Sequence, residues 1–229
     1  MIYEVTFYVN TPIITTTEIY FDSLLYAVSP ASHNKPEQLN RFTKEATLKD
    51  VPIPVDCIKI GNRYIYCCST ADFINVHKIV DTATKRREGL DFLYYHKQQT
   101  LKTGIDKNYM LKLYGVSCEC VKFLVSTSCC KELARYCRRI KSIGGMRKQG
   151  YGEIKNFEIK ELQNATWKDC IVSHNRALRN LPECFLENEC ENILRCRPPY
   201  WLLDGKEKCT SVGEKAILKK EVYLSEFRR

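Results

Sequence analysis

Four glycines within residues 142–154 constrain the fold of this 229-residue chain more than any other feature. The segment reads Ser-Ile-Gly-Gly-Met-Arg-Lys-Gln-Gly-Tyr-Gly-Glu-Ile and lies between a helical pattern and a strand pattern. Glycine adopts positive φ and lets another backbone approach closely, so the segment predicts a tight loop: either a helix cap with a turn into an edge strand, or a binding loop. Outward-pointing amides and cations suit a polyanion, and this favours RNA or DNA backbone. The predicted contacts are Gly144, Gly145, Arg147, Lys148, Gly150 and Tyr151.

Positive charge is concentrated in two windows of the sequence. Residues 77–112 contain eight Lys or Arg against four acids, a net charge of +4, and residues 131–155 contain eight against two, a net charge of +6. Since the whole chain carries +9, the remaining residues are close to neutral. One such window is commonly a solvated surface. Two windows that flank the same glycine loop favour a shared anionic partner.

The periodic segments predict an α+β fold. Residues 2–9 alternate as a strand, and residues 20–28 carry apolar side chains at helical spacing. A second helix is expected over about 128–141, with Ser128 as its N-cap and Gly144 placed to stop it. Its predicted apolar stripe is Leu133, Cys137 and Ile140, and the cations off that stripe are Arg135, Arg138 and Arg139.

The remaining segments are less regular. Residues 63–69 read as a strand, and residues 72–104 are polar, basic and weakly patterned, which indicates a long excursion from the fold. Two β segments separated near Gly115 are expected over 109–125, and a strand over 151–160. Periodicity fades after 164. We therefore expect one domain over 1–161 with a thumb-like insertion over about 72–104, and a C-terminal extension over 162–229.

The thirteen cysteines are an odd number spread over the chain, unlike a secreted disulfide scaffold. One group of four spaced cysteines lies near the C-terminal end, and the gaps between them are wider than those in zinc knuckles. Buried free thiols are therefore the preferred interpretation, and a structural zinc is the alternative. The first residues lack the features of a signal peptide, and no stretch is long enough for a membrane helix, so we expect a cytoplasmic protein. The spaced cysteines are Cys184, Cys190, Cys196 and Cys209.

The glycine loop and its surroundings resemble the RAMP superfamily of CRISPR–Cas proteins. Gly144 to Glu153 follow the form G-G-x-R-x-x-G-[YF]-G-E of that superfamily. Further segments, spread along the chain, resemble the Cas-five-like subunit of type IV systems, the third protein of the Csf series. These matches are Asn10-Thr-Pro-Ile, Phe21-Asp-Ser-Leu-Leu-Tyr-Ala, Thr84-Lys-Arg-Arg, Leu101-Lys-Thr-Gly, Arg179-Asn-Leu-Pro and Arg197-Pro-Pro-Tyr-Trp.

The resemblance implies a ferredoxin-like (RRM-like) module that binds CRISPR RNA without catalysis or a cofactor. Such a subunit holds the 5′ handle, abuts the first backbone subunit of the filament and lies near the target duplex. Arg147 and Lys148 would contact handle phosphates, and Tyr151 would either stack on a base or pack beside the loop. The segment 198–201 would either meet a neighbouring subunit or pack on its own domain. The thumb would place four more cations near the RNA: Lys85, Arg86, Arg87 and Lys102.

Two alternatives remain open at the level of the sequence. Some RAMP relatives cleave repeat RNA without a metal, and Tyr95, His96 and Lys97 supply the residue types that this reaction needs. However, 77 residues follow Gly152, whereas the loop of dedicated nucleases lies close to the C-terminus. The other alternative is a general RRM-like RNA-binding protein that works without partner subunits.

Overall fold

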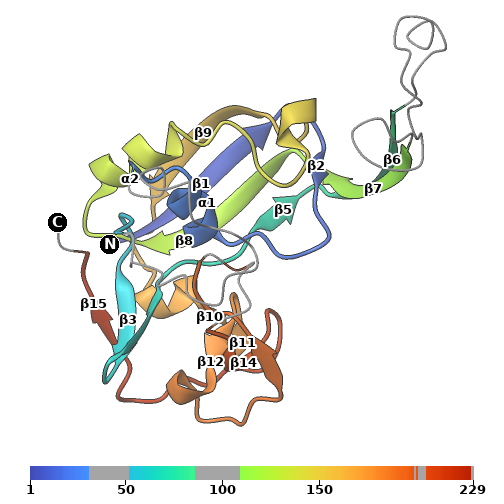
Figure 1. Ribbon diagram of the computed structural model, residues 1–229. Coiled ribbons are helices and arrows are strands. Elements are labelled where there is room, and N and C mark those ends of the chain that lie inside the picture. Colours follow the sequence, from blue (N-terminus) through green and yellow to red (C-terminus); the bar gives the residue numbers. More distant parts are fainter. Residues whose placement is uncertain (31–51, 86–108, 199, 201–204, 228–229) are drawn as a thin grey trace, which may run out of the picture.

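The computed structural model describes residues 1–30, 52–85, 109–198, 200 and 205–227, with the side chains of Lys85 and Tyr109 excepted (Figure 1). Its sheets are mostly antiparallel and its helices are few and short, so the predicted α+β class is confirmed. The described part contains five sheets, of which the central one has four strands.

The central sheet has the strand order β5-β8-β1-β9, and every pair of neighbours is antiparallel. The predicted strand over 2–9 is confirmed as β1, whose alternation buries Tyr3, Val5 and Phe7 on one face. The strands are β1 (Ile2–Val9), β5 (Asp72–Ile74), β8 (Cys120–Ser126) and β9 (Ile154–Glu161).

Helices α1 (Phe21–Ala27) and α2 (Cys130–Cys137) pack on the same face of this sheet, since the buried side chains of both contribute to one core with β1 and β8. The predicted stripe of α2 is buried, as expected. The predicted caps of α2 are wrong. Ser128 instead donates its hydroxyl to the carbonyl of Phe227 at 3.0 Å, and the helix ends well before Gly144.

A long two-stranded ribbon projects from the body of the protein (Figure 1). It consists of β6 (His77–Lys85) and β7 (Tyr109–Ser117), which pair without interruption, and its base continues to β2 (Ile13–Ile14). The two β segments predicted over 109–125 are confirmed as β7 and β8, but the break between them lies at residues 118–119 and not near Gly115, which is inside β7. The predicted insertion also begins too early, because Asp72–Ile74 is β5 of the central sheet.

The predicted C-terminal extension shares a second core with the N-terminal part. That core lies on the side of the central sheet opposite the helices. It includes Ile2, Ile58 and Ile65 together with Leu181 and Phe185. Because β15 pairs with β3, a division at residue 161 cuts through one sheet. The elements of this region are β3 (Cys57–Ile60), β4 (Arg63–Tyr66), η5 (Trp167–Cys170), β10 (Val172–Ser173), β11 (Arg176–Ala177), β12 (Leu181–Pro182), η6 (Glu183–Phe185), β13 (Asn192–Leu194), β14 (Glu207–Thr210) and β15 (Tyr223–Ser225).

Candidate nucleic-acid interface

The glycine loop joins α2 to the edge strand β9, and backbone hydrogen bonds close its base. The amide of Ile143 donates to the carbonyl of Gly152 at 2.8 Å, and the amide of Ile154 donates to that of Lys141 at 3.0 Å. Gly152 has φ +66°, and a Cβ there would lie 1.8 Å from the carbonyl oxygen of Ile143. Only glycine fits this position without moving the backbone.

The first glycine pair packs against β2 at the base of the ribbon. Gly144 has φ +89°, and a Cβ there would lie 2.8 Å from the carbonyl oxygen of Ile14. The neighbouring amide of Gly145 donates to the same oxygen at 2.7 Å. The pair therefore attaches the loop to the ribbon.

The prediction that the loop amides point outward is wrong for three of the four glycines. Besides Gly145, the amide of Gly152 donates to the carbonyl of Pro12 at 2.8 Å, and that of Gly150 donates to the carbonyl of Arg147 at 3.1 Å. The carbonyls of Pro12 and Ile14 need hydrogen-bond partners, and the amides of Gly152 and Gly145 supply them. Any anion bound here is therefore held mainly by side chains.

The tip of the loop is a single turn, η4 (Arg147–Gln149), that exposes both predicted cations. Within the described part of the chain, neither Arg147 nor Lys148 forms an ion pair with a carboxylate. Thr11 holds the turn in place, because its hydroxyl donates to the carbonyl of Gly150 at 2.7 Å and accepts from the amide of Glu153 at 2.9 Å. The turn thus presents two available charges on an anchored backbone.

Tyr151 connects the loop to the ribbon. Its hydroxyl donates to a carboxylate oxygen of Asp81 on β6, and this hydrogen bond raises the pKa of Tyr151 and lowers the pKa of Asp81. The sequence contains no pattern that pairs these two residues. This contact uses the hydroxyl of Tyr151, so the stacking of its ring on a base, or its packing beside the loop, stays a prediction.

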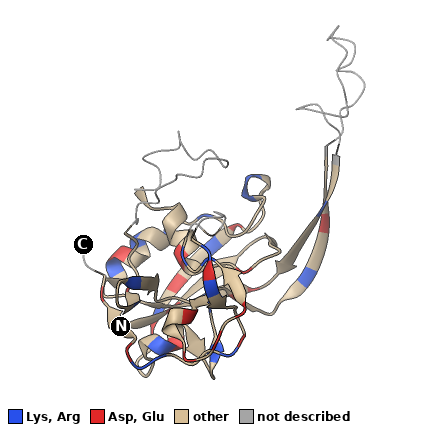
Figure 2. Ribbon diagram, turned by 60° about the horizontal axis from the view of Figure 1, so that its bottom comes forward, with Lys and Arg blue, Asp and Glu red and all other residues tan. Residues whose placement is uncertain are grey.

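The ribbon presents an exposed face opposite Asp81. Side chains alternate along paired strands, so Lys78, Val80, Lys112 and Tyr114 share that face, and all four are exposed. Figure 2 shows Lys and Arg both on the projecting ribbon and on the body beside it. Only the backbone of Lys85 is described. Six other residues of the predicted sites lie outside the described residues: Arg86, Arg87 and Lys102 of the predicted thumb, and Tyr95, His96 and Lys97 of the catalytic alternative.

The three predicted arginines of α2 differ in how far their charges are engaged. Arg135 is paired with Glu132 at 2.8 Å, and the guanidinium of Arg139 lies 5.9 Å from the ring centre of Tyr136. Arg138 and Arg139 are exposed where the chain leaves the helix toward the glycine loop. These two are better placed than Arg135 to bind an anion.

On the face of the central sheet turned away from the helices, a lysine and a tyrosine are paired with acidic side chains. Lys122 is paired with Glu4 at 3.0 Å, and the hydroxyl of Tyr8 donates to Glu158 at 3.3 Å. RNA-binding sheets use aromatic side chains on such a face to stack bases. Here Lys122 and Tyr8 are engaged with acids, and Lys160 of β9 is a further, exposed cation on this face. The loop and ribbon present more exposed cations and are the better candidate interface.

All thirteen cysteines lie in the described part, and all are free. Of the spaced group, Cys190, Cys196 and Cys209 are buried and Cys184 is half-buried. Cys196 donates its thiol to Cys209, which lowers the pKa of Cys209. No three or more His, Cys, Asp or Glu side chains of the described residues are arranged to hold a metal, so the zinc alternative finds no site among these four.

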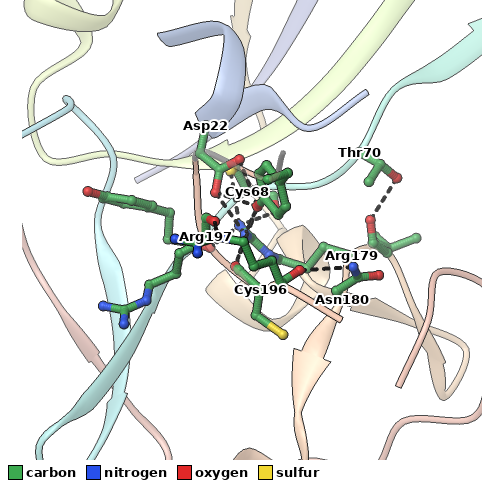
Figure 3. Close-up of polar contacts among 11 residues, drawn as sticks. Asp22, Cys68, Thr70, Arg179, Asn180, Cys196 and Arg197 are labelled. Carbon is green, nitrogen blue, oxygen red and sulfur yellow. Dashed lines mark hydrogen bonds and ion pairs between the residues drawn. The ribbon is translucent and has the colours of Figure 1, made fainter. Parts of the chain in front are cut away.

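Sequence reasoning missed a buried polar cluster between α1 and the C-terminal region (Figure 3). Arg179 is fully buried and donates to Asp22 at 2.8 Å, to the carbonyl of Cys196 at 2.9 Å and to the hydroxyl of Tyr200 at 2.7 Å. The ring of Tyr200 also stacks on Tyr20, with ring centres 4.0 Å apart. Tyr200 of the predicted subunit-contact segment is thus bound within its own chain; Pro199 and Trp201 lie outside the described residues.

Comparisons with known proteins give no family assignment. No protein-family model matches the chain, and no curated protein matches it. Among the described residues, no helix has both the length and the apolar character needed to cross a membrane.

Proposed function

We propose that this chain is a non-catalytic subunit of a CRISPR effector complex that holds the 5′ handle of the guide RNA and caps the backbone filament. The observation that carries the proposal is the hydrogen bond from Tyr151 to Asp81. It places the glycine loop, with the exposed cations Arg147 and Lys148, against the ribbon. The exposed lysines of the ribbon, Lys78 and Lys112, lie on its other face, so cations from two segments far apart in the sequence flank one projecting ribbon.

The topology supports the module that the sequence resemblance implies. The chain runs β1, α1, β5, β8, α2, β9 through the central sheet, whose strand order is β9-β1-β8-β5. A ferredoxin-like βαββαβ module has this succession, with both helices on one face. The glycine loop then precedes the last strand of the module, as in the RAMP superfamily.

The distribution of charge supports RNA as the ligand. The exposed cations of the loop and of the ribbon's outer face come from separate elements, while Asp81 on the opposite face is engaged by Tyr151. A polyanion can bind across such a region by displacing counterions. The exposed ring of Tyr114 adds a surface on which an unpaired base can stack.

The test is the salt dependence of RNA binding. A labelled single-stranded RNA with the CRISPR repeat sequence is titrated with the wild type and with the double variant Arg147→Ala/Lys148→Ala. Each lost phosphate contact lowers the slope of log affinity against log salt by about 0.7 for a single strand, so the slope should fall by about 1.4. The control Lys206→Ala/Lys208→Ala removes the same charge from the C-terminal region and should leave the slope unchanged.

Three other outcomes would contradict parts of the proposal. An equal loss of slope in both double variants would mean that net charge, and not the loop, attracts the RNA. Specific cleavage of the repeat RNA that His96→Ala abolishes would favour the metal-free endoribonuclease. Tight binding by the isolated chain, with no retention of neighbouring Cas subunits on copurification, would favour a general RRM-like RNA-binding protein.

A further inference from the structure

One face of the β15-β3-β4 sheet carries three tyrosines and a lysine; Tyr66 is buried in the first core, Tyr64 is half-buried beside it and Tyr223 is exposed. In the register of this sheet, Lys59 lies between Tyr64 and Tyr223, and Cys57 lies between Tyr66 and Ser225. Because side chains alternate along a strand, these two rows share one face. The row between them, Ile58, Ile65 and Leu224, points the other way into the second core.

A hollow of about 290 Å³ lies over this face. Lys59, Tyr64 and Tyr66 line it from the sheet, and the rings of the two tyrosines stand nearly perpendicular, with centres 5.9 Å apart. Its other walls include Ile53 and Phe227. Burial raises the pKa of the Cys57 thiol in this hollow to about 12, which agrees with an apolar lining.

The charges at the hollow favour a ligand with a negative group. Lys59 lies in its lining, and the guanidinium of Arg197 lies 4.6 Å from the ring centre of Tyr64. Glu226 is the one acid among the described lining residues. An apolar, aromatic hollow of this size with cations at its margin fits one planar heterocycle that carries a phosphate.

We infer that this hollow binds a single nucleobase, with the attached phosphate held by Lys59 and Arg197. The site is separate from the glycine loop, since β3 and β15 lie on the side of the molecule away from the β6–β7 ribbon (Figure 1). Only the assignment of the base to a bound RNA rests on the proposed function. A free mononucleotide has the same chemistry, and the experiment below distinguishes the two sources.

The experiment maps contacts by photocrosslinking. Single-stranded RNA containing 4-thiouridine is irradiated with the full chain, and crosslinked peptides are identified by mass spectrometry. Crosslinks within 52–66 or 222–227 are expected in addition to those within 143–152. If UMP abolishes the crosslinks in the hollow without releasing the RNA, a base of the strand occupies the hollow. If radiolabelled 4-thio-UMP crosslinks there and the RNA never does, the ligand is a free nucleotide.

Variants test whether stacking holds the base. Tyr64→Leu should weaken binding of UMP about tenfold, and Tyr64→Phe should leave it within about twofold, because the ring is retained. Lys59→Gln should weaken UMP more than uridine, whereas Lys59→Arg should not. Thermal unfolding of each variant shows whether a loss of binding reflects a loss of folding. If Tyr64→Leu unfolds, the comparison of Lys59→Gln with Lys59→Arg still tests the site, because Lys59 lines the hollow.

The outcomes separate this inference from the proposed function. Crosslinks confined to 143–152, with no binding of UMP, overturn the inference and leave the loop as the RNA-binding site. Crosslinks confined to the hollow support the inference and remove the loop from the interface. If a proline-rich peptide crosslinks within the hollow and neither RNA nor UMP does, the site is a peptide-binding surface and the inference is wrong.

Discussion

The guanidinium Nη2 of Arg179 lies 2.8 Å from Oδ2 of Asp22, although 157 residues separate them and both side chains are fully buried. This ion pair joins the C-terminal region to α1 at the edge of the first core. Burying two charges is costly unless each also satisfies its other hydrogen bonds. The carbonyls of Tyr66 and Cys68 and the hydroxyl of Tyr200 provide most of those partners, and only Nε of Arg179 has none among the described residues. The pair therefore holds two cores in one arrangement.

Removing one member of this pair should destabilise the protein strongly. Arg179→Ala leaves Asp22 buried without its counter-charge, and loss of one partner of a buried pair costs about 3–5 kcal/mol. Urea unfolding should show a correspondingly lower free energy of unfolding. Asp22→Ala should have a similar effect, and the double variant should cost less than the two single changes combined, because the residues interact.

An exposed pair serves as the control. Arg63 and Glu207 lie at a similar distance of 2.7 Å, but 62% of the Arg63 side chain is exposed. Arg63→Ala should therefore cost less than about 1 kcal/mol. Equal losses for Arg63→Ala and Arg179→Ala would show that the buried pair is not exceptional.

The glycines of the loop should differ in their tolerance of a side chain. Gly152→Ala forces a Cβ against the carbonyl of Ile143, so we expect a loss above about 2 kcal/mol. Gly150 also has positive φ, +87°, but its surroundings are open, so Gly150→Ala should cost only about 1 kcal/mol of backbone strain. Chemical denaturation of both variants measures the difference. Equal costs would contradict the close approach at Gly152.

The contact between Tyr151 and Asp81 should be visible in the titration of Asp81. The hydrogen bond from Tyr151 lowers the pKa of this carboxyl, so Tyr151→Phe should raise it toward its ordinary value. A lowered pKa means that the contact contributes above the ordinary pKa of the carboxyl and is lost as the pH falls through the lowered value. NMR titration of the Asp81 carboxyl measures the shift. An unchanged pKa in Tyr151→Phe would show that the loop and ribbon are not joined in solution.

The thiols of the buried Cys137 and the half-buried Cys118 should react slowly in the folded protein. Burial raises the pKa of Cys137 to about 12 and that of Cys118 to about 11, so little thiolate is present near neutral pH. Iodoacetamide followed by mass spectrometry should label these two sites much more slowly in the native protein than in denaturant. Equally fast labelling in both conditions would contradict their burial.

Local patterns of the sequence predicted the elements whose periodicity is strong. The alternation of residues 2–9 and the stripe of Leu133, Cys137 and Ile140 correspond to β1 and the buried side of α2. The ribbon was predicted less well, because the alternation of polar and apolar residues in its strands is weak. Strands β6 and β7 expose both polar and apolar side chains, because they extend beyond the core, and therefore lack the usual alternation.

The candidate site was predictable only in its location. The glycines and cations of residues 142–154 indicated a turn with charges at its tip, and Arg147 and Lys148 are indeed exposed there. The direction of the Gly145 and Gly152 amides was not predictable, because the carbonyls that accept them belong to residues 14 and 12. Hydrogen bonds between segments so far apart depend on how the sheets pack.

The sequence by itself determined the α+β class, the position of the glycine loop and the concentration of charge around it, because periodicity, glycine content and charge are local properties. The tertiary structure decided which distant side chains meet. Tyr151 on Asp81, Arg179 on Asp22 and the row Tyr223, Lys59 and Tyr64 each join residues from separate elements. Such contacts form only when hydrophobic cores fix the relative positions of the elements, and their energies depend on the burial that results.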